Sequence, residues 1–178
     1  MQINEAVRSH IREVPDFPIP GILFKDISPI FLNPQLTQDC AEHLSAHWQD
    51  HSIDKVVGID SRGFLLGPQI AIGLDAGFVM VRKKGKLPPE TVSVSYSLEY
   101  GTAEIESLTG SIVKEDRVLI HDDLLATGGT ASGAAELVEK LGGTVIGFSF
   151  IINLSYLKGD EKLHPYSDKI HYLVNYTT

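Results

Sequence analysis

The segment VLIHDDLLATGGTASG, residues 118–133, limits more than any other what this chain can fold into. An apolar run leads directly to two adjacent acids, Asp122 and Asp123, and a TGGT sequence follows them at the start of a helical pattern. Two glycines allow a tight turn whose amide groups point toward one spot, and the positive end of the following helix favours an anion there. Carboxylates beside such a loop suit sugar hydroxyls or a hard cation such as Mg²⁺. The segment therefore predicts a site for a ribose phosphate.

A TGGT sequence alone would indicate an ordinary loop, with the two acids as turn or cap residues. The order of strand, paired acids and glycine loop is what favours a binding site here. The chain has no GxxxxGK[ST] sequence and no GxGxxG after a strand, which excludes two familiar nucleotide-binding loops.

Strand-like apolar segments alternate with helical patterns along the rest of the chain. Strands are expected at 55–60, 77–85, 117–123, 144–153 and 169–176, and helices at 2–13, 35–51, 67–74 and 132–141. The proline-rich residues 15–31 predict an ordered extended crossing, and residues 91–106 predict a hairpin or a mobile arm. This alternation is typical of an α/β protein whose mainly parallel sheet is covered by helices. Ligands of such sheets bind beyond the carboxyl ends of the strands.

Composition excludes several classes of partner. The 178 residues are expected to form a single domain, 1–178, and 15 basic against 23 acidic residues give a net charge of −8, which argues against nucleic acid as a partner. No apolar run approaches the ~20 residues of a membrane span, and the N-terminus does not read as a secretory signal, so no membrane partner is expected. The one cysteine, Cys40, excludes an intramolecular disulfide, and the expected location is cytoplasmic.

Residues 118–130 resemble the phosphoribosyl-diphosphate (PRPP) signature of the type I phosphoribosyltransferases. Further segments resemble the members of that family that act on adenine, and they extend from about residue 10 to residue 160. These segments are PDFPIPGILFKDISPI (15–30), GIDSRGFLLGP (58–68), VRKKGKLP (81–88), YSLEYGTAEIE (96–106) and FIINLSYLKG (150–159). His121 departs from the pattern, because the family usually has an apolar or small residue before the two acids, and it is interpreted as a packing variant.

The resemblance implies a type I phosphoribosyltransferase fold with a parallel-sheet core flanked by helices. It also implies a small N-terminal hood over the base, at about residues 1–34, and a flexible lid at about residues 87–105. The implied reaction joins adenine to PRPP, with Mg²⁺, and gives AMP and diphosphate in purine salvage. A homodimer is expected from the family.

The resemblance also implies which residues bind PRPP. Asp122 and Asp123 would hold the ribose hydroxyls and lie near the Mg²⁺, which PRPP mainly carries, and no residue is assigned as a direct metal ligand. The 5′-phosphate would be bound by one loop, made of Ala126, Thr127, Gly128, Gly129 and Thr130. The diphosphate would be bound by a second loop and a basic cluster, namely Asp60, Ser61, Arg62 and Gly63, with Arg82 and Lys86. A non-proline cis peptide is implied near Asp60–Ser61. Without the family, Arg62 would be a surface-turn arginine and residues 82–86 a solvated run of charge.

The adenine site and the proton transfer complete the implied assignment. Phe24 and Leu154 would sandwich the purine, and the backbone of the segment around Leu23 and Lys25 would read its edge. Glu99 would accept the proton that the purine loses, in a closed and water-poor site, and Arg62 is assigned with it to catalysis. Without the family, Phe24 would be a core residue and Glu99 a solvated loop acid.

Two alternatives to this function remain open. The base could be a 6-oxopurine, since the PRPP signature is shared, or the chain could be a PRPP-sensing regulator without turnover. Among weaker signals, His43, His47 and His51 lie at i, i+4 and i+8, which suits metal ligands but better fits surface histidines on an amphipathic helix. The remaining signals fit core packing or a subunit contact: Cys40, Trp48, Tyr166, Tyr172 and Tyr176.

Overall fold

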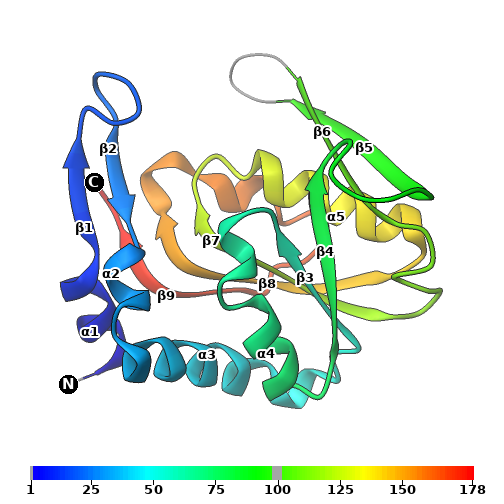
Figure 1. The fold of residues 1–178 in the computed structure, drawn as a ribbon, viewed down its shortest axis with the longest axis horizontal. Coiled ribbons are helices and arrows are strands. Elements are labelled where there is room, and N and C mark those ends of the chain that lie inside the picture. The colour runs from blue at the N-terminus through cyan, green and yellow to red at the C-terminus, as the bar shows by residue number, and fades with distance from the viewer. Residues whose placement is uncertain (1, 98–101) are drawn as a thin grey trace.

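A computed structural model describes residues 2–97 and 102–178, and these form a seven-stranded sheet, a two-stranded hairpin and the helices around them. The large sheet has the order β5-β6-β4-β3-β7-β8-β9 (Figure 1). Its strands are β5 (Thr91–Ser97), β6 (Thr102–Leu108), β4 (Gly77–Lys83), β3 (Lys55–Ile59), β7 (Arg117–Leu125), β8 (Thr144–Leu154) and β9 (Ile170–Tyr176). The strands β4, β3, β7, β8 and β9 pair in parallel, and β5 and β6 add an antiparallel hairpin at one edge. The predicted α/β class with a mainly parallel sheet is confirmed.

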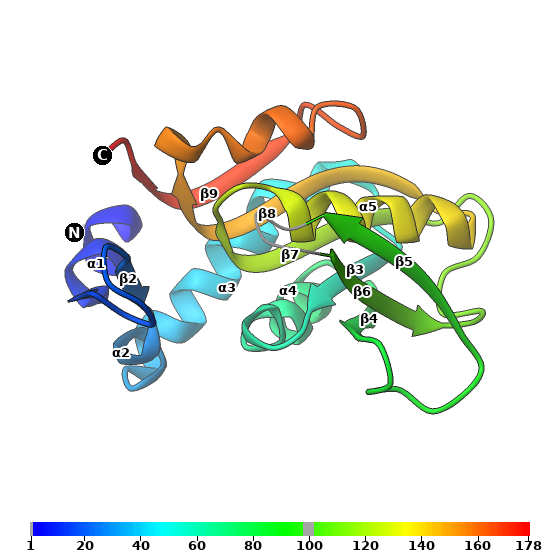
Figure 2. The ribbon, with the colours of Figure 1, turned by 90° about the horizontal axis from the view of Figure 1, so that it is seen from above.

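The core lies on both faces of this sheet, because successive side chains of a strand point to opposite faces. Val56 and Leu119 belong to the apolar cluster under the helices α3 (Pro34–Trp48) and α4 (Gly67–Gly73). Their neighbours Val57 and Ile120 belong to the cluster under α5 (Gly129–Leu141). Figure 2 shows α3 and α4 on one side of the sheet and α5 on the other. The central strands are therefore apolar on both faces, which is typical of covered parallel sheets.

Local signals explain where the helices begin and end. The Asn33 side chain accepts a hydrogen bond from the Leu36 amide at the start of α3, and Pro34 occupies the first turn. Gly142 ends α5 in the left-handed conformation with φ of 105°. Short 3₁₀ turns, η1 (Gln49–His51), η2 (Arg62–Phe64), η3 (Ser155–Leu157) and η4 (Gly159–Lys162), follow α3, β3 and β8.

The proline-rich segment is more regular than the expected extended crossing, and that expectation is wrong. Strands β1 (Arg12–Pro15) and β2 (Leu23–Asp26) form an antiparallel hairpin between α1 (Ile3–His10) and α2 (Ser28–Phe31). Pro18 and Pro20 fall in its turn, where the Gly21 amide donates to the Asp16 carboxylate, and Pro15 is the last residue of β1, so these prolines do not interrupt the ladder. This hairpin stands at one side of the carboxyl ends of the central strands, and the β5–β6 hairpin stands at the other (Figure 1).

The polar segment at 91–106 forms a hairpin, as expected, with its strands paired from Thr91 to Leu108. Residues 98–101, which include Glu99, lie outside the described part of the chain. Within the described residues, none of the helices is long and apolar enough to cross a membrane.

Candidate active site

The polar residues at the ends of β3, β4 and β7 line a single cavity of about 380 Å³. These strands are neighbours in the sheet, so residues far apart in sequence meet at its carboxyl edge. The polar and charged lining residues are Asp60, Ser61, Arg62, Arg82, Lys83, Tyr96, Asp122, Asp123 and Thr130. The structure therefore brings the ends of three strands to one cavity.

Asp122 and Asp123 form a buried acid pair at the end of β7. The Asp123 amide donates to Asp122 Oδ1 at 2.9 Å, and Arg62 Nε lies 3.2 Å from Asp123 Oδ2. Burial and the neighbouring Asp123 carboxylate raise the pKa of Asp122 well above its usual range. Burial also raises the pKa of Asp123, although the Arg62 charge opposes this. A cation or a set of hydroxyl donors would restore the ionised form of this pair.

The oxygen atom Asp123 Oδ2 is buried and accepts no hydrogen bond within the described part of the chain, because its contact with Arg62 is an ion pair without hydrogen-bond geometry. Buried polar atoms without a partner are uncommon and point to a missing ligand or water. Oxygen atoms are the ligands that Mg²⁺ prefers. The donor set therefore fits hydroxyl groups of a sugar or a hydrated magnesium ion.

The loop after the acid pair surrounds a smaller cavity of about 90 Å³, lined by Asp122 and residues 124–131. Gly128, with φ of 76°, is the N-cap of α5, and no side chain caps the helix there. A Cβ on Gly128 would lie 2.2 Å from the carbonyl oxygen of Gly159, so the loop packs closely against the turn after β8. The free amide groups at the start of α5 suit a phosphate.

The loop after β3 also packs closely, against the backbone of β7. The Asp60–Ser61 peptide is cis, as the resemblance implied. A Cβ on Gly63 would lie 2.8 Å from the His121 carbonyl oxygen, so only glycine allows this approach. Arg62, one residue earlier, is thereby held over the acid pair.

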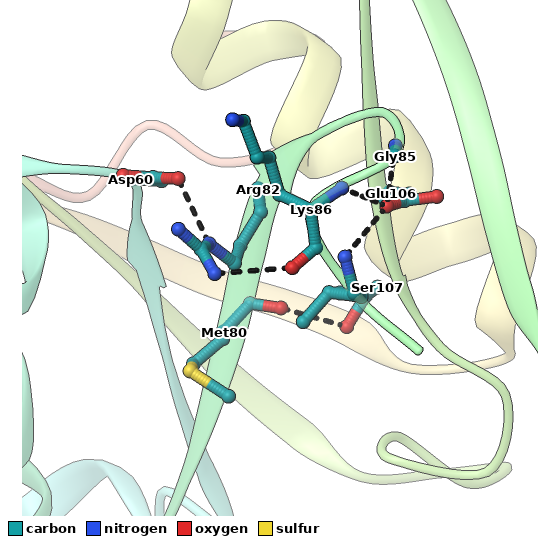
Figure 3. Close-up of polar contacts among 8 residues, drawn as sticks. Asp60, Met80, Arg82, Gly85, Lys86, Glu106 and Ser107 are labelled. Atoms are coloured by element: carbon teal, nitrogen blue, oxygen red, sulfur yellow. Dashed lines mark hydrogen bonds and ion pairs between the residues drawn. The ribbon is translucent and has the colours of Figure 1, made fainter. Parts of the chain in front are cut away.

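Arg82 is the best-anchored cation of the basic cluster. Its Nε donates to the Asp60 carboxylate at 2.8 Å, and its Nη1 donates to the Lys86 carbonyl oxygen at 3.1 Å (Figure 3). Lys84 pairs with Glu104 at 2.6 Å on the β5–β6 hairpin. The exposed side chains of Lys83 and Lys86 form no ion pair within residues 2–97 and 102–178.

Glu106 holds this basic loop in place from β6. Its Oε1 accepts hydrogen bonds from the amides of Gly85, Lys86 and Leu87 at 2.9–3.1 Å (Figure 3). Its Oε2 accepts one from the Thr91 hydroxyl at 2.9 Å. Burial favours the neutral acid, but these hydrogen bonds outweigh it and lower the pKa of Glu106. The carboxylate therefore stays charged and fixes the loop that carries Lys86.

A second cavity of about 470 Å³ lies under the β1–β2 hairpin. It is lined mainly by apolar and aromatic side chains, with a few polar groups at its edge: Arg12, Val14, Phe17, Phe24, Asp26, Ile27, Ser28, Phe31, Arg62 and Leu65. Arg62 lines both cavities, and its guanidinium carbon lies 5.3 Å from the centre of the Phe24 ring. A flat apolar ligand in this cavity would thus lie next to the acid pair.

Three residues assigned to the adenine site lie differently from Phe24. Leu23 is half-exposed on β2, the Lys25 side chain is buried on the opposite face of β2, and Leu154 is packed in the core at the end of β8. None of these three is among the residues that line the second cavity. Any role of Lys25 at that cavity therefore rests on its backbone groups. Glu99 lies outside the described residues.

Glu106 and Gly159 were not predicted as site residues. Glu106 looked like one of several acids in a polar strand, and only the pairing of β4 with β6 brings it to the amides of residues 85–87. Gly159 ended a segment that resembled the family, which was the only available signal for it. The two histidines of α3, His43 and His47, are exposed as expected. The His47 ring stacks on the ring of His171 from β9, with the ring centres 3.8 Å apart. Within the described residues, no group of histidine, cysteine and acidic side chains is arranged to hold a metal.

Comparison with known proteins gives one consistent result. Residues 27–177 match the family model of the phosphoribosyl transferase domain. The adenine phosphoribosyltransferase of Natranaerobius thermophilus is 51% identical over 164 residues, which cover 92% of this chain and 96% of the relative. The crystal structure of the enzyme of that name from Rhodothermus marinus superposes with a TM-score of 0.91 at 50% identity, over 98% of each chain. The Saccharomyces cerevisiae structure, complexed with an imino-altritol bisphosphate and adenine, has a TM-score of 0.90 at 39% identity, over 96% of this chain and 98% of that one.

Proposed function

The chain belongs to the adenine phosphoribosyltransferases of the phosphoribosyl transferase domain family, and from that premise we propose how its residues divide the work of the reaction. The enzyme transfers the 5-phosphoribosyl group of PRPP to adenine. N9 of the base bonds to C1′ of the ribose, the bond from C1′ to the diphosphate oxygen breaks, and the base loses a proton. The observation that carries the proposal is Arg62, which lines both the acidic, cation-rimmed cavity and the aromatic one.

The acid pair and the glycine loop would bind the ribose phosphate. Asp122 and Asp123 would accept hydrogen bonds from the ribose hydroxyls, which would supply the donor that the buried Asp123 Oδ2 needs. The amides and hydroxyls of residues 126–130 would bind the 5′-phosphate in the smaller cavity. Because the acid pair and the glycine loop belong to one strand–loop–helix unit, they would together set the position of C1′ relative to the base.

The diphosphate would lie against the loop of residues 60–63 and the basic cluster. The net charge of −8 repels PRPP, so local cations must reverse the field at the site. Arg82 would do so at the cavity wall and Lys86 from the loop that Glu106 holds. Mg²⁺ bound to PRPP, near Asp122 and Asp123, would neutralise the developing charge of the leaving diphosphate.

Adenine would occupy the cavity under the β1–β2 hairpin, against the Phe24 ring. The backbone of the segment around Leu23 would read the base edge, and Leu154 would close the other face. A carbonyl aimed at the exocyclic amine of adenine would be left unpaired against a 6-oxo group, which favours adenine. Glu99 would accept the proton of the base, with Arg62 beside the reacting atoms.

Two further expectations belong with this proposal. A lid at about residues 87–105, of which 98–101 lie outside the described residues, would close over PRPP and exclude water from the ribosyl centre. A homodimer is supported by exposed apolar side chains on and beside α4 and on the neighbouring β4, namely Leu65, Ile72 and Met80. The cytoplasmic location stays a prediction.

The test is base-dependent release of diphosphate from PRPP and Mg²⁺ with adenine, guanine, hypoxanthine and xanthine side by side. We expect turnover with adenine alone, and a loss of at least about 100-fold in kcat/KM in Asp123→Ala, because the partner of the ribose hydroxyls is removed. Turnover with a 6-oxopurine would overturn the base site but not the PRPP site. PRPP binding without turnover on any base would favour the sensing regulator.

A further inference from the structure

Lys25 is buried although its neighbours in β2 face a ligand cavity. The Lys25 residue is 4% exposed, and Phe24 and Asp26 on either side of it line the cavity under the hairpin. Alternation along a strand turns Lys25 to the opposite face. A buried ammonium group needs compensating partners, so the contacts behind β2 are the ones that hold this strand.

Tyr176 is the main partner of this ammonium group outside the hairpin. Lys25 Nζ lies 4.0 Å from the centre of the Tyr176 ring, and the Glu13 carboxylate pairs with the same ammonium from β1. The Arg8 guanidinium of α1 lies 4.6 Å from the centre of the same ring. Cations over an aromatic ring are attracted by its electron-rich face, most strongly where water is excluded. One ring thus joins α1 and the β1–β2 hairpin.

The ring is itself fixed to the central sheet. Tyr176 ends β9 and pairs with Leu154 at the end of β8, and its carbonyl oxygen accepts a hydrogen bond from Ser155 Oγ at 3.0 Å. Arg8 Nη2 also donates to the carbonyl oxygen of Asn175. The end of β9 therefore connects the N-terminal hairpin to β8, the strand that carries Leu154.

We propose that Tyr176 is a positioning residue for the base site: its ring holds Lys25 and so sets the distance and tilt of β2 over the central sheet. This inference rests on the proposed adenine site, because Phe24 of β2 lines the cavity that would hold the base. Tyr176 touches neither substrate. The PRPP residues lie on β3, β4, β7 and α5, none of which Tyr176 anchors, so its loss affects the base more than PRPP.

The experiment compares Tyr176→Leu, which removes the ring face, with Tyr176→Phe, which keeps it. We expect Tyr176→Leu to raise KM for adenine roughly three- to tenfold while KM for PRPP changes less than about twofold, because the ring face that holds Lys25 and Arg8 is lost. Tyr176→Phe should keep the wild-type KM for adenine, since it keeps the ring face that both cations contact. Tyr172→Leu, the same change on the same strand, is the matched control and should leave the ratio of the two KM values unaltered.

A second readout does not depend on turnover. Amide hydrogen exchange of residues 12–26 should accelerate in Tyr176→Leu and in Lys25→Met. The acceleration in the double variant should be smaller than the two single effects combined, because both changes remove the contact between Lys25 and the Tyr176 ring. Equal rises in both KM values, a Phe variant as impaired as the Leu variant, or unchanged exchange in the hairpin would overturn the proposal. A wild-type enzyme without turnover on adenine would instead contradict the proposed function, and the exchange measurement would still decide the role of Tyr176.

Discussion

His121 stands directly before the acid pair on β7, and its surroundings define its charge. The ring is fully buried on β7, Nδ1 lies 3.1 Å from the Ser149 carbonyl oxygen, and Nε2 has no hydrogen-bond partner within the described residues. Burial lowers the pKa of His121 to about 4, and the Ser149 contact only partly opposes this. The histidine is therefore neutral in the folded protein and acts as a packing residue, as interpreted from the sequence.

This burial predicts a loss of stability in acid. Between about pH 6.5 and 4 the unfolded chain binds a proton at His121 that the folded chain does not, so the free energy of unfolding falls as the pH falls. His121→Val lacks this penalty. As the pH is lowered from 7 to 4, we expect the free energy of unfolding of the variant to increase relative to that of wild type by on the order of 3 kcal/mol, as measured by urea unfolding at each pH.

Asp122 and Asp123 act in the opposite direction in the same experiment. Their raised pKa values mean that the folded state holds protons more tightly there, which adds stability as the pH falls. Burial and the nearby His47 lower the pKa of His171 to about 4, so His171 further decreases the free energy of unfolding as the pH falls. All three are present in wild type and variant, so the difference isolates His121. Parallel pH dependences in the two proteins would contradict the assignment.

The basic loop between β4 and β5 shows how an element keeps its shape without regular structure. Three of its amides donate to Glu106, and Arg82 donates to its Lys86 carbonyl oxygen (Figure 3). Hydrogen bonds to an ionised acceptor are stronger than neutral ones. One buried carboxylate on β6 thus holds a surface loop of like charges in one conformation.

Removal of this carboxylate should disorder the loop. We expect Glu106→Ala to raise KM for PRPP about tenfold or more and KM for adenine much less, because Lys86 loses its fixed position while the base cavity is untouched. Glu104→Ala, which removes the half-buried partner of the exposed Lys84 and lies on the same strand as Glu106, is the control and should have the smaller effect. Steady-state kinetics with each substrate varied in turn makes the measurement, and equal effects of the two variants would argue against Glu106 as the anchor.

At the scale of the whole molecule, the surface of α4 and β4 predicts association. Ile72 is 81% exposed on α4, and Leu65 and Met80 are also exposed nearby. Clustered exposed apolar side chains commonly mark an interface. We expect wild type to sediment at twice the 19.5-kDa chain mass and Ile72→Glu to shift toward the single chain. Leu32→Glu, at an equally exposed leucine beside α2, should leave the mass unchanged, and a wild-type monomer would exclude the dimer.

Much of this protein was determined by short segments of sequence alone. The alternation of apolar strands and helical patterns predicted the parallel sheet, and the order of strand, acids and glycines in residues 118–133 predicted the site at the end of β7. These signals are local, because side-chain periodicity, helix caps and glycine turns depend on neighbours a few residues away. The expectation of an extended crossing at 15–31 was wrong because β2, within that segment, pairs with β1, which precedes it, across a turn that contains Pro18 and Pro20.

Tertiary structure alone decided how these segments combine. Nothing near Glu106 in sequence marks it as the acceptor for residues 85–87, and nothing near Lys25 or Tyr176 marks them as partners across about 150 residues of chain. The placement of Arg62 between two cavities likewise depends on strand order and on the approach that Gly63 allows. A buried charge acquires its role from whatever the fold brings within a few ångströms of it, and that distance is set by the packing of the whole chain.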